Sequence, residues 1–595
     1  MQFRLMFGIL AMSLIMVGSA SAAVDSAAEF LEMVQTQVDR GELTADEALL
    51  IKFQYAFDRE KLPEQYQPTW KAPMKCGTPL VMEFMQSQGR MDSEIAATIE
   101  GYLTLPEGNR LNYWAPSHLF RLNYQVSGSN AVPPADDNAN GVPDYVELVA
   151  EYMDYSLDYE CNTLGFSMPP FQADAAYMTV TLQNLDGIYG YTQPVGYPTG
   201  MTHIVLDNDF VGYAPNDDPD GNELGAAKVT AAHEFKHSTQ YVGSNWSEGG
   251  WNEVDATWAE EIVYPMVNDY LNYLPFGSPI SSPTMALDGG STGTGSYEDC
   301  VWQHYMSQTH GIQFVVDYYD YRKTHQGQAV MDSYEQMFAT YGSDLNIAWA
   351  NFTAWNFACG ARSLADAGYE EDDLYPTGSA QKTMYVYPDD HNGYVAHLAA
   401  NFIRCLSVDD AGKNMKITFN GNDNARMTLS AVVNVSYSTH AGVYYTIPLD
   451  SNNDAVFQVP YDLDGVYSVG FVVGNAAKTG TNMSYSVDIE QVDAVVNGVG
   501  DEVPSFTIAG NYPNPFNPST AIKFNLSGAA ATQLDIFDLS GRKVRTLVQA
   551  NLGAGEHTVR WNGQDDSGRS LASGTYLAKL RSGEQVTTHK LVLAK

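Results

Sequence analysis

The stretch "TAAHEFKHSTQYV", residues 230–242, contains two histidines four positions apart, with a glutamate directly after the first. Residues i and i+4 share one face of a helix, so His233 and His237 can present their imidazoles to one metal ion. Glu234 then lies about 100° round the helix, beside the ion, where its carboxylate can accept a proton from a water that the ion activates. The spacing is that of the His-Glu-x-x-His pattern of catalytic zinc sites.

A third ligand is available in "WNEVDATWAEEIVYP", which begins at Trp251. Catalytic zinc takes three protein ligands and keeps a fourth position open for water. Glu253 follows His237 after fifteen intervening residues, on a second predicted helix, and completes that set. The alternative for Glu253 is a helix cap or a surface carboxylate. Glu260 lies two turns further along the same face, where it either holds a ligand histidine by its other ring nitrogen or is an exposed carboxylate.

A tyrosine follows the Gly- and Ser-rich loop "DGGSTGTGS" further along the chain. Tyr297 leads the predicted helix "YEDCVWQHYM", and a phenol there can donate a hydrogen bond to the oxyanion of a tetrahedral intermediate. Spacing alone does not single this residue out, because the chain contains 38 tyrosines.

These motifs together resemble the gluzincin metallopeptidases. In their aminopeptidase branch a W-x-N-E motif carries the third zinc ligand and a second glutamate follows seven residues later, which implies these roles for Glu253 and Glu260 in "WNEVDATWAE". A Y-E-x-G-type motif carries the transition-state tyrosine, and "YEDC" at Tyr297 is similar, with Cys300 in place of the glycine. The G-x-M-E-N motif of those aminopeptidases is absent from this sequence, so the resemblance implies the zinc site and not the exopeptidase specificity.

A closer resemblance covers roughly residues 30–380. There "VTAAHEFKHSTQY" and "ATWAEEIVYP" resemble an uncharacterised group of large secreted bacterial metalloproteases. We therefore expect an α+β, zincin-like metallopeptidase domain over residues 113–385. Its predicted strands lie at 120–126, 177–185 and 202–210, and its predicted helices lie at 228–242, 252–271 and 298–309.

The segment "DDNANGVPDYVE", residues 136–147, matches the EF-hand calcium loop at every position. Gly141 occupies the place of the sharp turn, and a predicted helix follows the loop. The alternative is a turn rich in Asp and Asn that holds no ion. The six predicted calcium ligands are Asp136, Asn138, Asn140, the carbonyl of Val142, Asp144 and Glu147.

The N-terminus reads "MQFRLMFGILAMSLIMVGSASA", in which a basic residue precedes an apolar run and small residues end it. This pattern predicts a secretory signal peptide over residues 1–22. A membrane anchor is the alternative, but the run is short for a span, and we expect no transmembrane segment in the mature chain. The formal net charge of −40 argues against nucleic acid and anionic membranes as partners. The protein is therefore expected to be secreted or at the cell surface.

Residues 23–112 are predicted to be a pro-region, and "MKCGTPL" around Cys76 lies within it. A thiolate is a strong zinc ligand, so Cys76 can occupy the open zinc position and keep a zymogen inactive. The letters resemble the cysteine switch "RCG-x-P" of matrix metalloproteinases. The alternatives are a buried thiol or a disulfide to Cys161. Since the chain has five cysteines, at least one thiol stays unpaired within it.

Two β domains are predicted after the helical region. Short alternating strands over residues 386–497 predict a β-sandwich, and residues 503–595 predict a second small all-β domain. The latter, which contains "NYPNPFNPSTAIKFNLSG", resembles the FlgD-like C-terminal domain of type IX secretion sorting signals. That resemblance implies the secretion machinery as a partner, and the alternative is a general carbohydrate- or protein-binding module.

The sequence as a whole favours a secreted zinc-dependent endopeptidase that acts on protein or peptide substrates, with Zn²⁺ at the catalytic site and Ca²⁺ in the loop. Its predicted fold class is multidomain, an α+β zincin-like domain followed by two all-β sandwich domains. Two other hypotheses stay open. One is a non-enzymatic adhesin that keeps the metal-binding helix, and the other is a metal-dependent hydrolase of a non-peptide substrate.

Overall fold

The computed structural model describes residues 30–593 with gaps, so the predicted signal peptide at 1–22 lies outside the described residues. The gaps are 32, 68–73, 106–109, 172–176, 186, 197–199, 289–296, 366, 437, 481, 495–506, 513–515, 517–518, 527–529, 539–541, 554, 567, 573 and 584.

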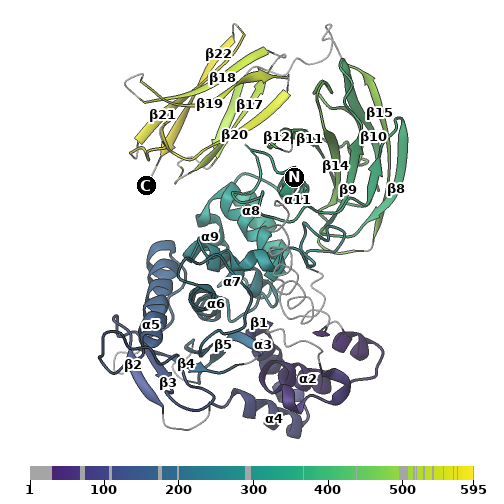
Figure 1. Ribbon diagram of the computed structural model, residues 1–595. Helices are drawn as coiled ribbons and strands as arrows, with labels where there is room; N and C mark the ends of the chain where they lie inside the picture. Colours follow the sequence, from purple (N-terminus) through teal and green to yellow (C-terminus); the bar gives the residue numbers. More distant parts are fainter. Residues whose placement is uncertain are drawn as a thin grey trace, which may run out of the picture. The chain divides into compact units, whose positions relative to one another are not determined.

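The chain divides into two compact units, whose helices and strands are labelled in Figure 1. The first unit comprises the described residues within Met1–Phe276, Gly290–Val301 and Tyr318–Val330, and the second comprises those within Gly277–Gly289, Trp302–Asp317 and Met331–Lys595. This division differs from the domain boundary expected at residue 385, because the later helices pack with the strands that follow them.

The first unit is built on a six-stranded mixed sheet with the strand order β1-β5-β6-β4-β3-β2. Strands β3, β4 and β6 run parallel, and they confirm the three strands predicted from the sequence. Strand β5 is antiparallel to β6, and β1 pairs with β5 in parallel. The strands are β1 (Met74–Cys76), β2 (Leu111–Trp114), β3 (Phe120–Tyr124), β4 (Met178–Gln183), β5 (Ile188–Pro194) and β6 (Thr202–Asp207).

Helix α6 (Asn222–Ser244) carries the 230–242 stretch and lies against β5 and β6, beside α5 (Asp144–Leu157) and α7 (Trp251–Val263). Gly190 on β5 permits this close approach, since a Cβ atom there would lie 2.9 Å from Cγ2 of Thr230. Helix α7 is shorter than the predicted helix 252–271. It ends ahead of Pro265, whose ring nitrogen cannot donate the next helical hydrogen bond.

The N-terminal segment of the first unit is helical and packs with β5 around one apolar core. Helix α2 begins at Ala45 after the N-cap Thr44, whose side chain forms a capping box with Glu47. Buried side chains such as Phe53 and Leu80 pack in one cluster with Ile188 of β5. The helices of this segment include α2 (Ala45–Phe57), α3 (Thr78–Ser87) and α4 (Ser93–Leu103).

Strand β1 joins this N-terminal segment to the sheet. The Met74 N–H donates to the Gly187 carbonyl at 2.6 Å, and the Gly77 N–H donates to the Gly190 carbonyl at 2.9 Å. The predicted pro-region therefore shares a sheet and a core with the residues that follow it. The expected boundary at residue 112 falls inside β2.

The second unit contains helices packed on a two-sheet β-sandwich. Helix α11 buries Phe357 in one apolar cluster with Phe402 of β9 and Val432 of β11, which explains why this helix groups with the strands. The described helices from 301 to 357 are α8 (Val301–His310), α9 (Ile312–Arg322, which spans both units), α10 (Val330–Thr340) and α11 (Leu345–Phe357).

The β-sandwich predicted at 386–497 is confirmed, with its first strand beginning slightly earlier. Its sheets have the orders β13-β10-β15-β8 and β12-β11-β14-β9-β7, and a shared apolar core lies between them. The strands are β7 (Lys382–Met384), β8 (Asp389–Val395), β9 (Ala399–Leu406), β10 (Lys413–Asn420), β11 (Met427–Ser436), β12 (Ala441–Ile447), β13 (Asp454–Gln458), β14 (Ser468–Asn475) and β15 (Met483–Asp493).

A second, smaller all-β domain occupies the C-terminal region, as the sequence predicts. A three-stranded sheet, β16-β17-β20, and a four-stranded sheet, β19-β18-β21-β22, enclose a core that includes Trp561. The strands are β16 (Thr507–Tyr512), β17 (Thr520–Leu526), β18 (Ala530–Asp538), β19 (Lys543–Leu552), β20 (Gly555–Trp561), β21 (Gly574–Ser582) and β22 (Gln585–Leu593).

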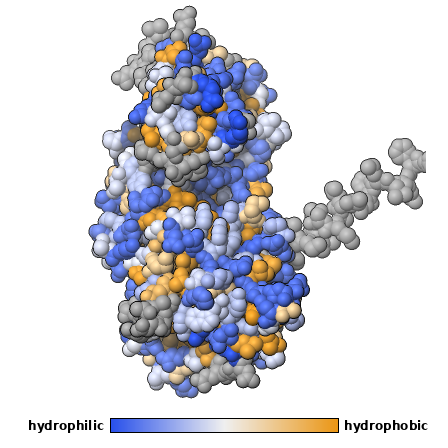
Figure 2. Space-filling model, turned by 90° about the vertical axis from the view of Figure 1, so that its left-hand side faces the viewer, coloured by the Kyte–Doolittle hydropathy of each residue, from blue (hydrophilic) through white to orange (hydrophobic). Residues whose placement is uncertain are grey.

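The surface view in Figure 2 shows hydrophilic residues over much of one face, with hydrophobic residues in small groups among them. Within the described ranges, no helix has the length and apolar character that a membrane span requires. All five cysteines are buried and free. The disulfide alternative for Cys76 is therefore wrong, and Cys161 instead contacts the carbonyl of Ser167 through its thiol, at 3.8 Å.

Candidate metal centre

The two histidines of α6 and the glutamate of α7 meet at one point. Nε2 of His237 lies 3.2 Å from Nε2 of His233. The Glu253 carboxylate lies between the two rings, with Oε2 at 3.1 Å from His233 Nε2 and Oε1 at 3.0 Å from His237 Nε2. All three side chains are buried. The structure thus brings together the three residues predicted as zinc ligands.

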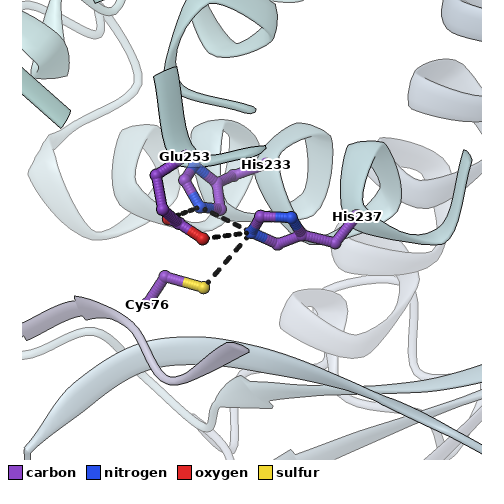
Figure 3. Close-up of side chains that lie close together, drawn as sticks. All are labelled: Cys76, His233, His237 and Glu253. Carbon is purple, nitrogen blue, oxygen red and sulfur yellow. Dashed lines mark hydrogen bonds and ion pairs between the residues drawn. The ribbon is translucent and has the colours of Figure 1, made fainter. Parts of the chain in front are cut away.

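Cys76 joins this group from the opposite side, on strand β1. Its Sγ atom lies 3.4 Å from His237 Nε2. One donor atom from each of Cys76, His233, His237 and Glu253 lies within 4.8 Å of every other, and Figure 3 shows the four side chains pointing toward one another. Among the described residues, this is the only such group of three or more His, Cys, Asp or Glu side chains. We call these four residues the metal cluster.

Both imidazoles are oriented through their other ring nitrogen. Nδ1 of His233 donates to Oε1 of Glu260 at 2.7 Å, and Nδ1 of His237 donates to Oε1 of Gln240 at 2.8 Å. The Gln240 amide is fixed in this sense because its nitrogen donates to the Asn252 carbonyl. With protons on both Nδ1 atoms, the two Nε2 atoms would be free to bind a metal ion at the centre of the cluster, which is the orientation of metal-bound histidines.

The donor set fits a zinc ion. Two imidazole nitrogens, one carboxylate and one thiol are the ligand types that zinc prefers. With bonds of about 2.0–2.3 Å, the ligand atoms of a tetrahedral zinc site lie roughly 3.3–3.7 Å apart. The Nε2–Nε2 and Sγ–Nε2 distances of 3.2 and 3.4 Å lie close to that range.

The cluster is electrostatically coupled even without an ion. Burial lowers the pKa of His233, but the hydrogen bonds that its ring donates to the Glu253 and Glu260 carboxylates outweigh this effect and raise that pKa to about 10. Burial raises the pKa of Glu253, but the two histidines outweigh it and hold that pKa at about 2. Burial, together with the charges of Glu234 and Glu253, holds the pKa of the Cys76 thiol well above its usual range. A divalent cation has the opposite effect, because it lowers the pKa of a thiol that binds to it.

Glu234 lies beside the cluster and not within it, as the helical spacing predicts. Its Oε2 atom accepts hydrogen bonds from Thr78 Oγ1 at 3.0 Å and from Thr192 Oγ1 at 2.8 Å. Its Oε1 atom is buried and has no hydrogen-bond partner among the described residues. An unpartnered buried carboxylate oxygen is costly for a fold. Its presence next to four metal donors marks this carboxylate as a candidate proton acceptor.

Tyr297 contacts the backbone of the strand that carries Cys76. Its phenolic oxygen lies 3.1 Å from the Cys76 backbone nitrogen and 3.3 Å from the Cys76 carbonyl oxygen. Its ring centroid lies 6.2 Å from that of His233. The tyrosine that the sequence alone could not single out is therefore at the cluster, within reach of a peptide group.

The predicted calcium loop is folded, and Gly141 has the left-handed φ of +88° that its turn requires. The Asp136 carboxylate accepts the Asn140 and Gly141 backbone N–H groups at 3.0 and 2.9 Å. Glu147 accepts hydrogen bonds from the side-chain amides of Asn138 and Asn140. The acidic residues here do not form a group of the kind found at the metal cluster. Calcium in this loop remains a prediction.

Several residues that contact the site were not predicted from the sequence. Gln240 follows His237 by three positions, so helical spacing was a signal that could have found it. Thr192 comes from β5, and both Thr78 and Lys75 flank Cys76 in the N-terminal segment. Nothing in their local sequence relates these three residues to α6, because only the β1–β5 pairing brings them to the site.

Comparisons with known proteins identify one part of the chain. Residues 516–585 match the family described as the FlgD Ig-like domain. These residues lie in the domain formed by β16–β22, so the resemblance inferred there from sequence is confirmed at the level of the FlgD-like domain. No curated protein matches the chain significantly.

Solved structures give only weak similarity. They include PorZ, a bacterial surface component of the type-IX secretion system of Porphyromonas gingivalis (17% identity, 25% of this chain and 20% of that chain, TM-score 0.13). Another is the latent PorU of the same organism, with 15% identity over 31% of this chain and 18% of that chain and a TM-score of 0.14. A third is the adhesin domain of Epf from Streptococcus pyogenes, with 9% identity over 35% of this chain and 73% of that chain and a TM-score of 0.13. The chain thus spans about a fifth of the length of PorZ and PorU.

Proposed function

We propose that this protein is a secreted zinc-dependent endopeptidase and that the structure describes its latent form. The observation that carries the proposal is the metal cluster itself, with Glu234 directly beside it. His233, His237 and Glu253 supply the three ligands of a catalytic zinc site, and Cys76 occupies the fourth position. The arrangement also supports the zincin-like, gluzincin-type expectation for residues 113–385.

Each residue around the cluster has a role that its contacts support. A zinc ion, when bound, supplies Lewis acidity that polarises a carbonyl and lowers the pKa of water. Glu234 accepts the proton of the attacking water and passes it to the leaving amine, and its unpartnered Oε1 is the atom available for this step. Tyr297 already contacts the Cys76 carbonyl, and in a substrate complex it donates to the oxyanion of the scissile peptide. Glu260 and Gln240 hold the two histidines in orientation.

Strand β5 offers the place for a substrate chain. An extended peptide can add to an exposed strand through main-chain hydrogen bonds. In the structure β1 occupies that place on β5, and it brings a peptide carbonyl to Tyr297 and a thiol to the cluster. Thr78, just beyond β1, also engages Glu234. The N-terminal segment thus blocks the ligand position, the proton acceptor and the substrate strand together, as a pro-region would.

The C-terminal domain suggests how the protein leaves the cell. Its match to the FlgD Ig-like domain family supports our proposal that residues 503–595 engage the type IX secretion machinery as a sorting domain, so that the protein is secreted or surface-attached. The test is a chain truncated after the β-sandwich, which should be synthesised but retained in the cell. Export of the truncated chain at the normal level would exclude this role.

The enzymatic proposal is tested by metal analysis and a peptidase assay on two matched variants. Glu234→Gln should keep its zinc and its melting temperature but lose hydrolysis, because a carboxamide fills the space and cannot accept the proton. Glu223→Gln makes the same chemical change at an exposed position of α6 and should keep full activity. Zinc-free protein, or hydrolysis undiminished in Glu234→Gln, contradicts the proposal. Cleavage of a non-peptide ester but of no peptide favours the alternative hydrolase hypothesis.

A further inference from the structure

Lys75 is buried next to the metal cluster and has two acidic partners. Its side chain is fully buried, and its Nζ atom lies 3.0 Å from Oε2 of Glu260 and forms a second ion pair with Asp269. Both carboxylates are buried as well. Lys75 is the residue before Cys76 on β1, so a cation from the N-terminal segment reaches into a pocket made by the rest of the unit.

The rings of two tyrosines also lie next to the same ammonium group. Nζ of Lys75 lies 4.6 Å from the ring centroid of Tyr189 and 5.7 Å from that of Tyr273. Both distances lie within the range of cation–π attraction. We call Glu260, Asp269, Tyr189 and Tyr273 the acidic pocket. Two carboxylates and two π faces around one position make up a site built for a cation on an alkyl stem.

The acidic pocket loses the counter-charge of both its carboxylates when β1 is absent. A buried carboxylate without a counter-charge is strongly unfavourable, so a cation that enters in place of Lys75 would be stabilised there. Glu260 retains its contact with His233, but Asp269 loses its ion pair with Lys75. Oδ1 of Asp269 has no hydrogen-bond partner among the described residues even with Lys75 in place. Oδ1 of Asp269 can therefore accept a further hydrogen bond that Lys75 does not donate.

The strand register relates this pocket to the place of a substrate. Met74 pairs with Ile188 and Cys76 pairs with Gly190, so Lys75 lies beside Tyr189 of β5. Successive side chains of an extended peptide point to opposite faces. In a peptide that adds to β5 in place of β1, one side chain therefore points toward the metal cluster and the side chain of the neighbouring residue points toward the acidic pocket.

We propose that the acidic pocket is a specificity subsite that takes a lysine or arginine side chain of the substrate, next to the scissile bond. Lys75 fills it in the latent chain as an internal stand-in. This inference rests on the proposed peptidase function and adds the substrate class to it. The competing explanation is that the ion pairs only anchor β1 and play no part in substrate selection.

The first test maps cleavage sites. The full chain, activated by a thiol-reactive mercurial, is given a mixture of peptides, and the products are identified by mass spectrometry. Lysine or arginine should predominate at one fixed position beside the cleaved bond. Asp269→Asn should lower kcat/KM for a lysine peptide at least tenfold relative to its norleucine analogue. Asp218→Asn is the matched control, since that buried carboxylate pairs with Lys228 away from the cluster, and its ratio should not change.

The second test does not depend on activity. In full-length Lys75→Ala the pocket lacks its cation, so n-butylammonium should raise the melting temperature and n-butanol should not. Lys52→Ala, which removes another buried lysine of the same segment, should show no such rescue. Equal effects of butylammonium and butanol on Lys75→Ala overturn the inference. Peptide cleavage without a basic preference overturns it and leaves the proposed function standing. A chain that cleaves no peptide in any form overturns both.

Discussion

Sγ of Cys76 lies 3.4 Å from Nε2 of His237, although 161 positions separate the two residues along the chain. The contact depends on the parallel pairing of β1 with β5, which carries the N-terminal segment across the helix that holds both histidines. A buried thiol in this place competes directly with any water or substrate for the open position of a zinc ion. The strength of that competition is open to experiment.

Replacing Cys76 should release the latent protein. Wild-type full chain should show little peptidase activity, and Cys76→Ser should raise it at least tenfold, because a serine hydroxyl is a much weaker zinc ligand than a thiolate. A mercurial reagent should activate wild type but add nothing to Cys76→Ser. Cys161→Ser removes another buried thiol of the same unit and should stay latent and responsive to the reagent.

Two other results would change this interpretation. If neither the substitution nor the reagent acts until the N-terminal segment is cut, β1 blocks the site by its bulk and Cys76 is not the latch. If the wild-type full chain is already as active as a chain cut near residue 112, the segment is a structural part of the mature enzyme.

The two glutamates of α7 should differ in their effect on the metal. Glu253→Ala should lose zinc, because its carboxylate contacts both histidines at the cluster. Glu260→Gln should bind zinc about 10- to 100-fold more weakly, since it acts through Nδ1 of His233. Zinc titration with a competing chelator measures both affinities, and Glu223→Ala serves as the control. Full zinc content in Glu253→Ala would move the third ligand elsewhere.

Calcium should stabilise the loop at residues 136–147. Asp136, Asp144 and Glu147 repel one another when no cation is present. A calcium ion that binds only the folded state adds about 2.7 kcal/mol to the free energy of unfolding at a free calcium concentration 100 times Kd. Added calcium should therefore raise the melting temperature of wild type but not of Asp136→Ala. Asp137→Ala alters a loop position that is not a predicted ligand, and it should respond as wild type does. An unchanged melt in every protein excludes the site.

One carboxyl of the second unit should make its stability depend on pH. Burial and the charge of Asp373 raise the pKa of Asp372 to about 8. The folded protein then binds more protons than the unfolded chain between about pH 4 and pH 8, so the free energy of unfolding should fall as pH rises through that window. Asp372→Asn should flatten this slope, as measured by melting temperature at several pH values. Asp410→Asn, at an exposed position, should leave the slope unchanged.

Local sequence determined the helical part of the site. The i, i+4 spacing of His233 and His237 fixes both imidazoles on one face of any helix, and the same geometry places Glu234 beside them. The alternation of the later strands and the FlgD-like segment were likewise predictable from the sequence, because each depends on residues that are neighbours in the chain.

Only the tertiary structure decided what closes the site. The sequence left three roles open for Cys76, namely a zinc-blocking thiol, a buried thiol and a disulfide to Cys161. Lys75, Thr78 and Thr192 were not predicted from the sequence at all. Their positions depend on β1 pairing with β5, a contact between segments more than a hundred residues apart. Such pairing is selected by packing of the whole unit, through features such as the close approach at Gly190, and no local periodicity encodes it. The sequence thus determined the metal-binding helix, and long-range sheet pairing determined which residues complete and block it.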